Sequence, residues 1–470
     1  MDKNLRVINL GISSFYDALI SQGVDAAQID WKPPVKVNVE LGAKVDRIME
    51  SGFAAKMHQA NQDAIDMIIN ADPEWIGVGL AGDFIEGLDD YTVTHSGPPI
   101  SFDEMVMLHQ RGMVSACLFE GWAKTEEEAL ALIKSGKIKM ISALDTNTVG
   151  AGTGIITKNV AMIIIKDRNN GKIAATFPAE GIRFQGGFCG WGLYSPEIAE
   201  NLYHMRDYLL PPMDRVAKMK GGVPIKPILA ESMQMGDENH TRQSAADLLF
   251  EHQVLLDMAK IDDMDREQVL ASMNYIVETP RFFHCFGQGA SRAANLGNVG
   301  REYSTMVTAV CGNGVRFGIK IAALGDQWFE ADAPYMKGQY TSSKFTIDDQ
   351  LPWIGDSCVV ECAGLGGLAA AASPITCNLR GMNLRESIAQ TREMEKICIG
   401  KNHNYPIPNL DFDFLPVGID MMKVIKTGIC PCIHGGMFNK EGGLIGAGMA
   451  RVPMECFEKA FAAYCEKYGL

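Results

Sequence analysis

The feature that most constrains the fold is the strand–turn–helix–strand pattern at the start of the chain. Val7 to Leu10 has the pattern of a strand, Gly11 to Ser14 that of a turn, and Phe15 to Ser21 that of a helix. Val24 to Asp30 then supplies a second strand. Because parallel strands are joined by a crossover that is usually a helix, this order is typical of a βαβ unit. The pattern predicts a Rossmann-like α/β domain at the N-terminus.

The turn that follows the first strand is a candidate cofactor site. Gly11, Ser13 and Ser14 precede the helix, where free backbone N–H groups can bind a phosphate or pyrophosphate. The G-x-G-x-x-G fingerprint of a dinucleotide site is missing, because only one of its three glycines is present. A Rossmann-like fold is therefore better supported than NAD binding. A nucleotide- or CoA-dependent enzyme of unknown substrate remains an alternative.

The length of the chain predicts several domains of α/β and α+β structure. At 470 residues, it exceeds the size at which a single hydrophobic core stops growing. Changes in pattern divide it into a Rossmann-like α/β domain at 1–90, an α+β domain at 91–235, a helical domain at 236–295 and a glycine-rich α+β domain at 296–470.

Two local signals support this organisation. Asn170-Gly171 separates two apolar runs, and glycine accepts the positive φ of a tight turn, so we expect a hairpin there. Asp265 and Gln268 have the spacing of a capping box ahead of a helical pattern. No strand pattern appears between Thr241 and Glu278, which predicts an all-α segment.

Composition and charge exclude several classes of partner. The 43 lysines and arginines are outnumbered by 57 acidic residues, for a net charge of −14, so nucleic acid is a poor candidate. We also expect no membrane span, because no stretch offers about 18 uninterrupted apolar residues. The chain begins without the basic start and apolar core of a secretion signal, which favours a cytoplasmic protein. Its 12 cysteines include no C-x-x-C pair and are expected to be free thiols.

The segment 235–242 is the strongest candidate for catalysis. Within six positions it carries Asp237, Glu238, His240 and Arg242, just before a helical pattern. A carboxylate beside an imidazole orients it for proton transfer, so we expect these four side chains to be catalytic. A structural alternative is that Asp237 caps the following helix. A divalent metal bound by Asp237, Glu238 and His240 is a further alternative, although neighbouring side chains on one turn diverge.

Two glycine-rich segments are candidates for binding anions. Asn313, Gly314 and Arg316 combine exposed backbone with a guanidinium that can grip a carboxylate or phosphate. His434 and Arg451 lie in or beside glycine-rich stretches near the C-terminus. The alternatives are an Asn-Gly hairpin turn in the first case and closely packed strands in the second.

Other nucleophile and histidine signals are weaker. His284 is interpreted as a packed core histidine rather than a base, because it lies between Phe283 and Cys285. The G-x-S-x-G, P-loop and H-E-x-x-H motifs are absent, which gives covalent hydrolase chemistry little support.

Several motifs together carry a family resemblance that extends over nearly the whole chain. They are Asn9-Leu10-Gly11, Trp31-x-Pro33-Pro34, Gly236-Asp237-Glu238-x-His240-x-Arg242, Gly312-Asn313-Gly314 and Gly446-Ala447-Gly448-Met449-Ala450. With these, the chain resembles the AllG/YlbE-like family. The Gly-Asp-Glu-x-His-x-Arg element is the most specific part of the likeness.

The resemblance implies a subunit of bacterial oxamate carbamoyltransferase in allantoin and purine breakdown. With FdrA-like and AllH-like partners, that enzyme converts oxalurate and phosphate into oxamate and carbamoyl phosphate. The alternative is a non-catalytic scaffold or regulatory subunit of the same complex. The resemblance supplies no residue roles, and the Ser-Thr-Arg-Thr-Arg element of aspartate and ornithine carbamoyltransferases is absent. A homodimer is expected on general grounds.

The predicted chemistry follows from the charges of the substrates. Oxalurate and phosphate are both small anions, so we expect Arg242, Arg316 and Arg451 to hold them. His240 would protonate the departing amide nitrogen, while Asp237 or Glu238 sets its tautomer.

Overall fold

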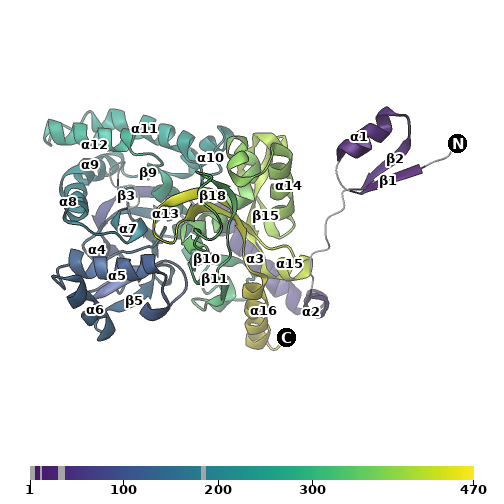
Figure 1. Cartoon of the computed structure of the whole chain (residues 1–470), viewed down its shortest axis with the longest axis horizontal. Helices are drawn as coiled ribbons and strands as arrows, with labels where there is room; N and C mark the ends of the chain where they lie inside the picture. The colour runs from purple at the N-terminus through teal and green to yellow at the C-terminus, as the bar shows by residue number, and fades with distance from the viewer. Residues whose placement is uncertain (1–5, 11–12, 30–37, 181–186) are drawn as a thin grey trace.

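The computed structural model describes residues 6–10, 13–29, 38–180 and 187–470. Over these residues the chain is a mixture of helices and several β-sheets (Figure 1). This agrees with the predicted α/β and α+β multidomain character. No helix in the described ranges combines the length and apolarity that a membrane span requires.

The N-terminal pattern forms a small βαβ unit, drawn in purple in Figure 1. Strands β1 (Arg6–Leu10) and β2 (Asp25–Ile29) are parallel and flank helix α1 (Ser13–Ser21). The next strand, β3 (Pro73–Leu80), pairs with β7 and β9 in a different sheet. Among the described residues, the βαβ unit therefore has a two-stranded sheet of its own, and β3 pairs with strands that lie beyond residue 90.

The sheet that contains β3 has five strands among the described residues. In spatial order they are β6 (Thr148–Val149), β8 (Ile173–Thr176), β7 (Ala161–Asp167), β3 and β9 (Val223–Pro224). Strands β7 and β8 are antiparallel and joined through Gly171, whose φ is +73°, so the predicted hairpin is confirmed.

The remaining sheets are smaller. One pairs β4 (Thr92–His95) with β5 (Lys139–Ser142). Another has the order β12 (Phe329–Asp332), β11 (Arg316–Ile321), β10 (Val307–Asn313) and β14 (Ile354–Gly355). A third has the order β13 (Lys337–Tyr340), β18 (Leu444–Arg451) and β17 (Cys432–Phe438). The last described sheet pairs β15 (Cys398–Ile407) with β16 (Asp413–Ile419).

Helices cover these sheets. The N-terminal half contributes α2 (Val39–Met49), α3 (Phe53–Ile69), α4 (Ala81–Phe84), α5 (Met107–Phe119), α6 (Glu126–Lys134), α7 (Phe188–Trp191), α8 (Pro196–His204), α9 (Leu210–Lys220) and α10 (Lys226–Gln234). The rest contributes α11 (Ser244–Met258), α12 (Arg266–Glu278), α13 (His284–Leu296), α14 (Leu384–Glu395), α15 (Met421–Thr427) and α16 (Met454–Tyr468). Between β9 and β10, all of which is described, the regular elements are helices, in agreement with the predicted all-α segment.

Helix α13 and the short 3₁₀ helix η6 (Ser357–Ala363) pack against each other. Helix α13 also packs against strands β7 and β8. One apolar core joins these elements, with Trp75 of β3 packed on Phe250 and Phe286. This core brings segments that are far apart in the sequence to the same place, and the candidate site lies there.

Candidate active site

The segment 235–242 forms a sharply bent loop between α10 and α11. Gly236 and Asn239 both have positive φ, at +105° and +62°. The Asn239 amide is held inside the fold, because it accepts a hydrogen bond from Ser232 Oγ at 3.1 Å and donates one to the Leu229 carbonyl at 3.3 Å. This anchoring directs the next residue, His240, toward η6.

The imidazole of His240 lies between a serine and a glutamate. Its Nδ1 is 2.9 Å from Glu361 Oε1, and its Nε2 is 3.0 Å from Ser357 Oγ. An ionised carboxylate only accepts hydrogen bonds, so in the neutral form of the ring Nδ1–H donates to Glu361 and Nε2 accepts the Ser357 hydroxyl. We expected Asp237 or Glu238 to orient the ring, but the carboxylate that does so is Glu361.

Glu361 is fully buried and held by three donors. Besides His240, its Oε1 accepts the backbone N–H groups of Gly367 and His434, each at 3.0 Å. Burial raises the pKa of Glu361, and the His240 ring and the two amides oppose that rise. A Cβ at Gly366 would overlap both Glu361 and His240, so glycine is required for the close approach. The carboxylate is thus fixed before any substrate binds.

A cavity of about 250 Å³ opens beside this group. Its polar side chains belong to His240, Thr241, Arg281, His284 and Ser357. The rest of its wall consists of aromatic, aliphatic and glycine residues, which include parts of α7, β17 and β18. A small, mainly apolar pocket with a few convergent polar groups is typical of a binding site for a small molecule.

Arg281 supplies a cation to this pocket. Its backbone has a φ of +60°, and its side chain has no hydrogen bond or ion pair to any residue that the structure describes. Next to it, burial lowers the pKa of His284 well below the usual value, and the charges of Arg281 and His240 add to this effect. His284 is therefore neutral and stacks on His240 with 6.2 Å between ring centroids. Arg281 thus has no close ion-pair partner among the described residues, although the carboxylates of Glu238 and Asp247 act on its charge from a longer distance.

Asp356 ties the serine to the opposite wall. Its carboxylate accepts hydrogen bonds from Gly97 N at 2.7 Å and Gly150 N at 3.0 Å. Burial raises the pKa of Asp356 to about 7. The loop that follows Gly150 turns at Gly152, whose φ is +62° and whose N–H finds no acceptor among the described residues. Gly152 lines the pocket, and its backbone nitrogen lies close to Gly355, two residues before Ser357.

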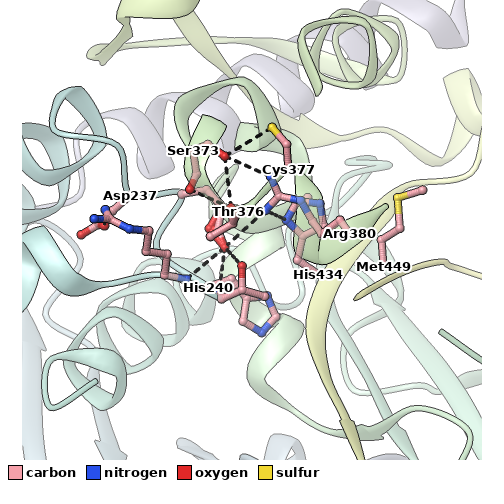
Figure 2. A network of polar contacts seen from close by, with 12 residues as sticks. Asp237, His240, Ser373, Thr376, Cys377, Arg380, His434 and Met449 are labelled. Atoms are coloured by element: carbon pink, nitrogen blue, oxygen red, sulfur yellow. Dashed lines mark hydrogen bonds and ion pairs between the residues drawn. The ribbon is translucent and has the colours of Figure 1, made fainter. Parts of the chain in front are cut away.

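Two of the four predicted catalytic residues have structural contacts instead. Asp237 accepts the backbone N–H groups of Ala245 and Ala246, both at 2.8 Å, and forms an ion pair with Arg242. These contacts agree with the structural alternative, in which Asp237 caps the following helix. In Figure 2 the His240 ring points away from Asp237. Neither Asp237 nor Arg242 lines the pocket.

Glu238 belongs to a buried network behind the site. It accepts hydrogen bonds from the Thr241 hydroxyl and from Arg242 N, and Arg380 Nη1 lies 4.0 Å away. Arg380 in turn donates to His434 Nδ1 at 3.3 Å (Figure 2). Burial and the Arg380 charge lower the pKa of His434. His434 is thus connected to the site through its backbone N–H, which is hydrogen-bonded to Glu361.

The other predicted anion-binding groups do not line the pocket. Asn313 accepts hydrogen bonds from Arg316 N at 2.7 Å and from Val315 N at 3.1 Å, and Gly314 has a φ of +83°, as expected for the hairpin alternative. Arg316 is paired with Asp332 at 2.7 Å and is 48% exposed. Arg451 binds the Cys430 carbonyl at 2.8 Å and pairs with Glu393. These guanidiniums are already neutralised at the surface.

The remaining expectations concern cofactors. Gly11 lies outside the described residues, whereas Ser13 and Ser14 begin α1. In the described part of the chain, no group of three or more His, Cys, Asp or Glu side chains is arranged to hold a metal ion.

Three residues of the pocket and its support escaped the sequence reasoning: Arg281, Ser357 and Glu361. His284, which the sequence indicated to be a packed core histidine, lines the pocket. One signal was present, because Glu361 stands in the apolar run Cys358–Cys362, where a charge needs a partner. Its four-residue spacing from Ser357 also allows both side chains to face the same neighbour. The position of His240 against them was not readable, since it lies 117 and 121 residues away.

Comparison with known proteins places this geometry in context. The family described as oxamate carbamoyltransferase subunit AllG matches residues 138–357, which include His240, Arg281 and Ser357. In Escherichia coli K12, the uncharacterized protein YahG is 34% identical over 468 residues, which are 99% of this chain and 98% of YahG. The oxamate carbamoyltransferase subunit AllG of the same organism is 33% identical over 417 residues, which are 88% of this chain and 98% of that protein.

A solved structure has the same fold. It is the crystal structure of a conserved protein of unknown function from Enterococcus faecalis V583. It superimposes with a TM-score of 0.82 at 31% identity, covering 88% of this chain and 99% of the other.

Proposed function

Because this chain belongs to the AllG family, we propose that it is the subunit of an oxamate carbamoyltransferase in which carbamoyl transfer takes place. The reaction converts oxalurate and phosphate into oxamate and carbamoyl phosphate. FdrA-like and AllH-like chains are the proposed partners. The alternative is a scaffold subunit whose partner carries the chemistry.

The observation that carries this proposal is the His240 ring at a pocket that also contains an unpaired guanidinium. His240 is oriented by Glu361 at 2.9 Å, and Arg281 lines the same cavity. Oxalurate combines a carboxylate with a ureido carbonyl, so Arg281 can hold the carboxylate in a forked geometry while the carbonyl lies near His240. Breaking the ureido C–N bond requires a proton on the departing nitrogen, which a positioned imidazole supplies.

The network behind the pocket supports the same role. Glu361, His434, Arg380 and Glu238 are all buried and connected by hydrogen bonds or ion pairs. Such rigid support holds a catalytic group in its productive geometry. A scaffold subunit would have no need to orient an imidazole in this way toward a cavity.

The experiment compares the wild-type and His240→Ala chains, each alone and co-purified with FdrA-like and AllH-like subunits. Carbamoyl phosphate formed from oxalurate and phosphate is measured, with carbamate kinase as the coupling enzyme. We expect turnover in the complex and a loss of about 10²-fold or more with His240→Ala, as for general acid–base catalysis. Unchanged turnover in an intact variant complex would assign the chemistry to a partner chain.

A further inference from the structure

Ser357, His240 and Glu361 have the geometry of a nucleophile, its base and the group that orients the base. The serine hydroxyl is 3.0 Å from His240 Nε2, and Glu361 is 2.9 Å from Nδ1. Hydrogen-bond contact from nucleophile to base and from base to a third group is the structural signature of an activated serine. The absence of a G-x-S-x-G motif does not bear on this, because such groups are recognised by geometry and not by sequence position.

We propose that Ser357 is the nucleophile and that the carbamoyl group passes through a covalent carbamoyl–Ser357 enzyme. The inference rests on the proposed function for the identity of the transferred group. The reactivity of Ser357 is inferred independently of the proposed function.

In the first half-reaction, Ser357 Oγ attacks the ureido carbonyl carbon of oxalurate and its proton passes to His240 Nε2. The bond between that carbon and the oxamate nitrogen then breaks, and the nitrogen takes the proton from His240. In the second, a phosphate oxygen attacks the carbamoyl carbon while its proton passes to His240. The carbon–Oγ bond breaks, Ser357 recovers its proton, and carbamoyl phosphate leaves.

The charge of the pocket favours two sequential half-reactions. Of the side chains known to line it, Arg281 is the one that carries a permanent positive charge. Oxalurate and phosphate are both anions, and binding them together in about 250 Å³ would bring like charges into contact. With a covalent intermediate, oxamate leaves before phosphate enters. One guanidinium can therefore serve both anions in turn.

The opposite wall offers a donor for the oxygen that becomes negative. Gly152 lines the same cavity, and its N–H has no acceptor within the described residues. A backbone N–H aimed at a developing oxyanion stabilises the tetrahedral intermediate without reorganisation. Asp356 holds this wall against the serine, because it binds Gly150 N and directly precedes Ser357.

The test uses the assembled complex with wild-type, Ser357→Ala and Ser291→Ala chains. Ser291 is a matched control, since its hydroxyl is also buried but bonds to the Gly287 carbonyl at 2.9 Å, away from this pocket. Radiolabelled oxamate is incubated with oxalurate and enzyme in the absence of phosphate. A covalent intermediate predicts exchange of label into oxalurate by the wild type and by Ser291→Ala. We expect Ser357→Ala to lower both exchange and turnover about 10³-fold or more, with an unchanged melting temperature.

A second probe tests the serine independently of the substrate. A fluorophosphonate should label Ser357, as identified by peptide mass spectrometry, and His240→Ala should abolish the labelling. Labelling without oxalurate turnover would refute the proposed function but leave the nucleophile. Turnover that persists in Ser357→Ala, or exchange that requires phosphate, would refute the nucleophile but leave the function. If Ser357→Ala has a lower melting temperature than the wild type, the Ser357→Cys variant takes its place in the test. This variant keeps a nucleophilic atom and should accumulate a carbamoyl adduct.

Discussion

Glu361→Gln removes the charge that faces His240 while nearly preserving the shape of the side chain. In the wild type, Oε1 accepts three hydrogen bonds, from the His240 ring and from the backbone of Gly367 and His434. A glutamine oxygen can accept the same three. Its amide nitrogen then takes the place of Oε2, which has no hydrogen-bond partner among the described residues. The imidazolium that forms during proton transfer would face a neutral group.

The expected loss follows from the geometry. Nδ1 and Oε1 are 2.9 Å apart, which puts the centres of the two charges about 4 Å apart. At an effective dielectric constant of about 20, two unit charges at that distance attract by about 4 kcal/mol. Since about 1.4 kcal/mol corresponds to a factor of ten in rate, kcat should fall about 10³-fold. An unpaired buried amide costs about 1–3 kcal/mol, so the protein should still fold.

The assay is steady-state turnover of oxalurate by the complex, together with urea unfolding of the chain. Glu74→Gln is the matched control, because Glu74 is also a buried glutamate but pairs with Arg168 and does not line the pocket. We expect kcat to change less than about tenfold for that variant. If Glu361→Gln keeps kcat within tenfold of the wild type, or if Glu74→Gln loses as much, Glu361 is not the group that stabilises the imidazolium.

Two further predictions concern the walls of the pocket. Arg281→Lys should raise the KM for oxalurate and phosphate about tenfold or more with a smaller effect on kcat, because the planar fork of the guanidinium is lost. KM values equal to those of the wild type would contradict anion binding by Arg281. The buried Asp356 carboxyl has a pKa near 7 in the folded chain, against about 4 when unfolded. The folded state thus binds more protons between these values, and the free energy of unfolding should fall as pH rises from about 4 to 7. Asp356→Asn should flatten this slope in urea titrations at several pH values, whereas parallel profiles would show that another group causes it.

The features that the sequence predicted well depend on short stretches of chain. The hairpin at Gly171 needs only a residue that accepts positive φ between two apolar runs. Of the capping box predicted at Asp265, one half is present: the Asp265 carboxylate accepts the Gln268 N–H at 2.9 Å, whereas the Gln268 side chain donates to the Tyr208 carbonyl. Family membership was also readable, because the motifs that carry it are local. Of the catalytic cluster, His240 does line the pocket.

The composition of the site was decided by tertiary packing. Asp237 and His240 are three residues apart, yet the turn at Asn239 sends one to the start of α11 and the other to the pocket. The partners of His240 come from a helix more than 100 residues away, because the apolar core packs α13 against η6. A run of neighbouring ionisable residues indicates that their charges must be paired with other side chains or bound to a ligand. Which of them share a cavity depends on the three-dimensional path of the backbone, and local spacing carries no information about it.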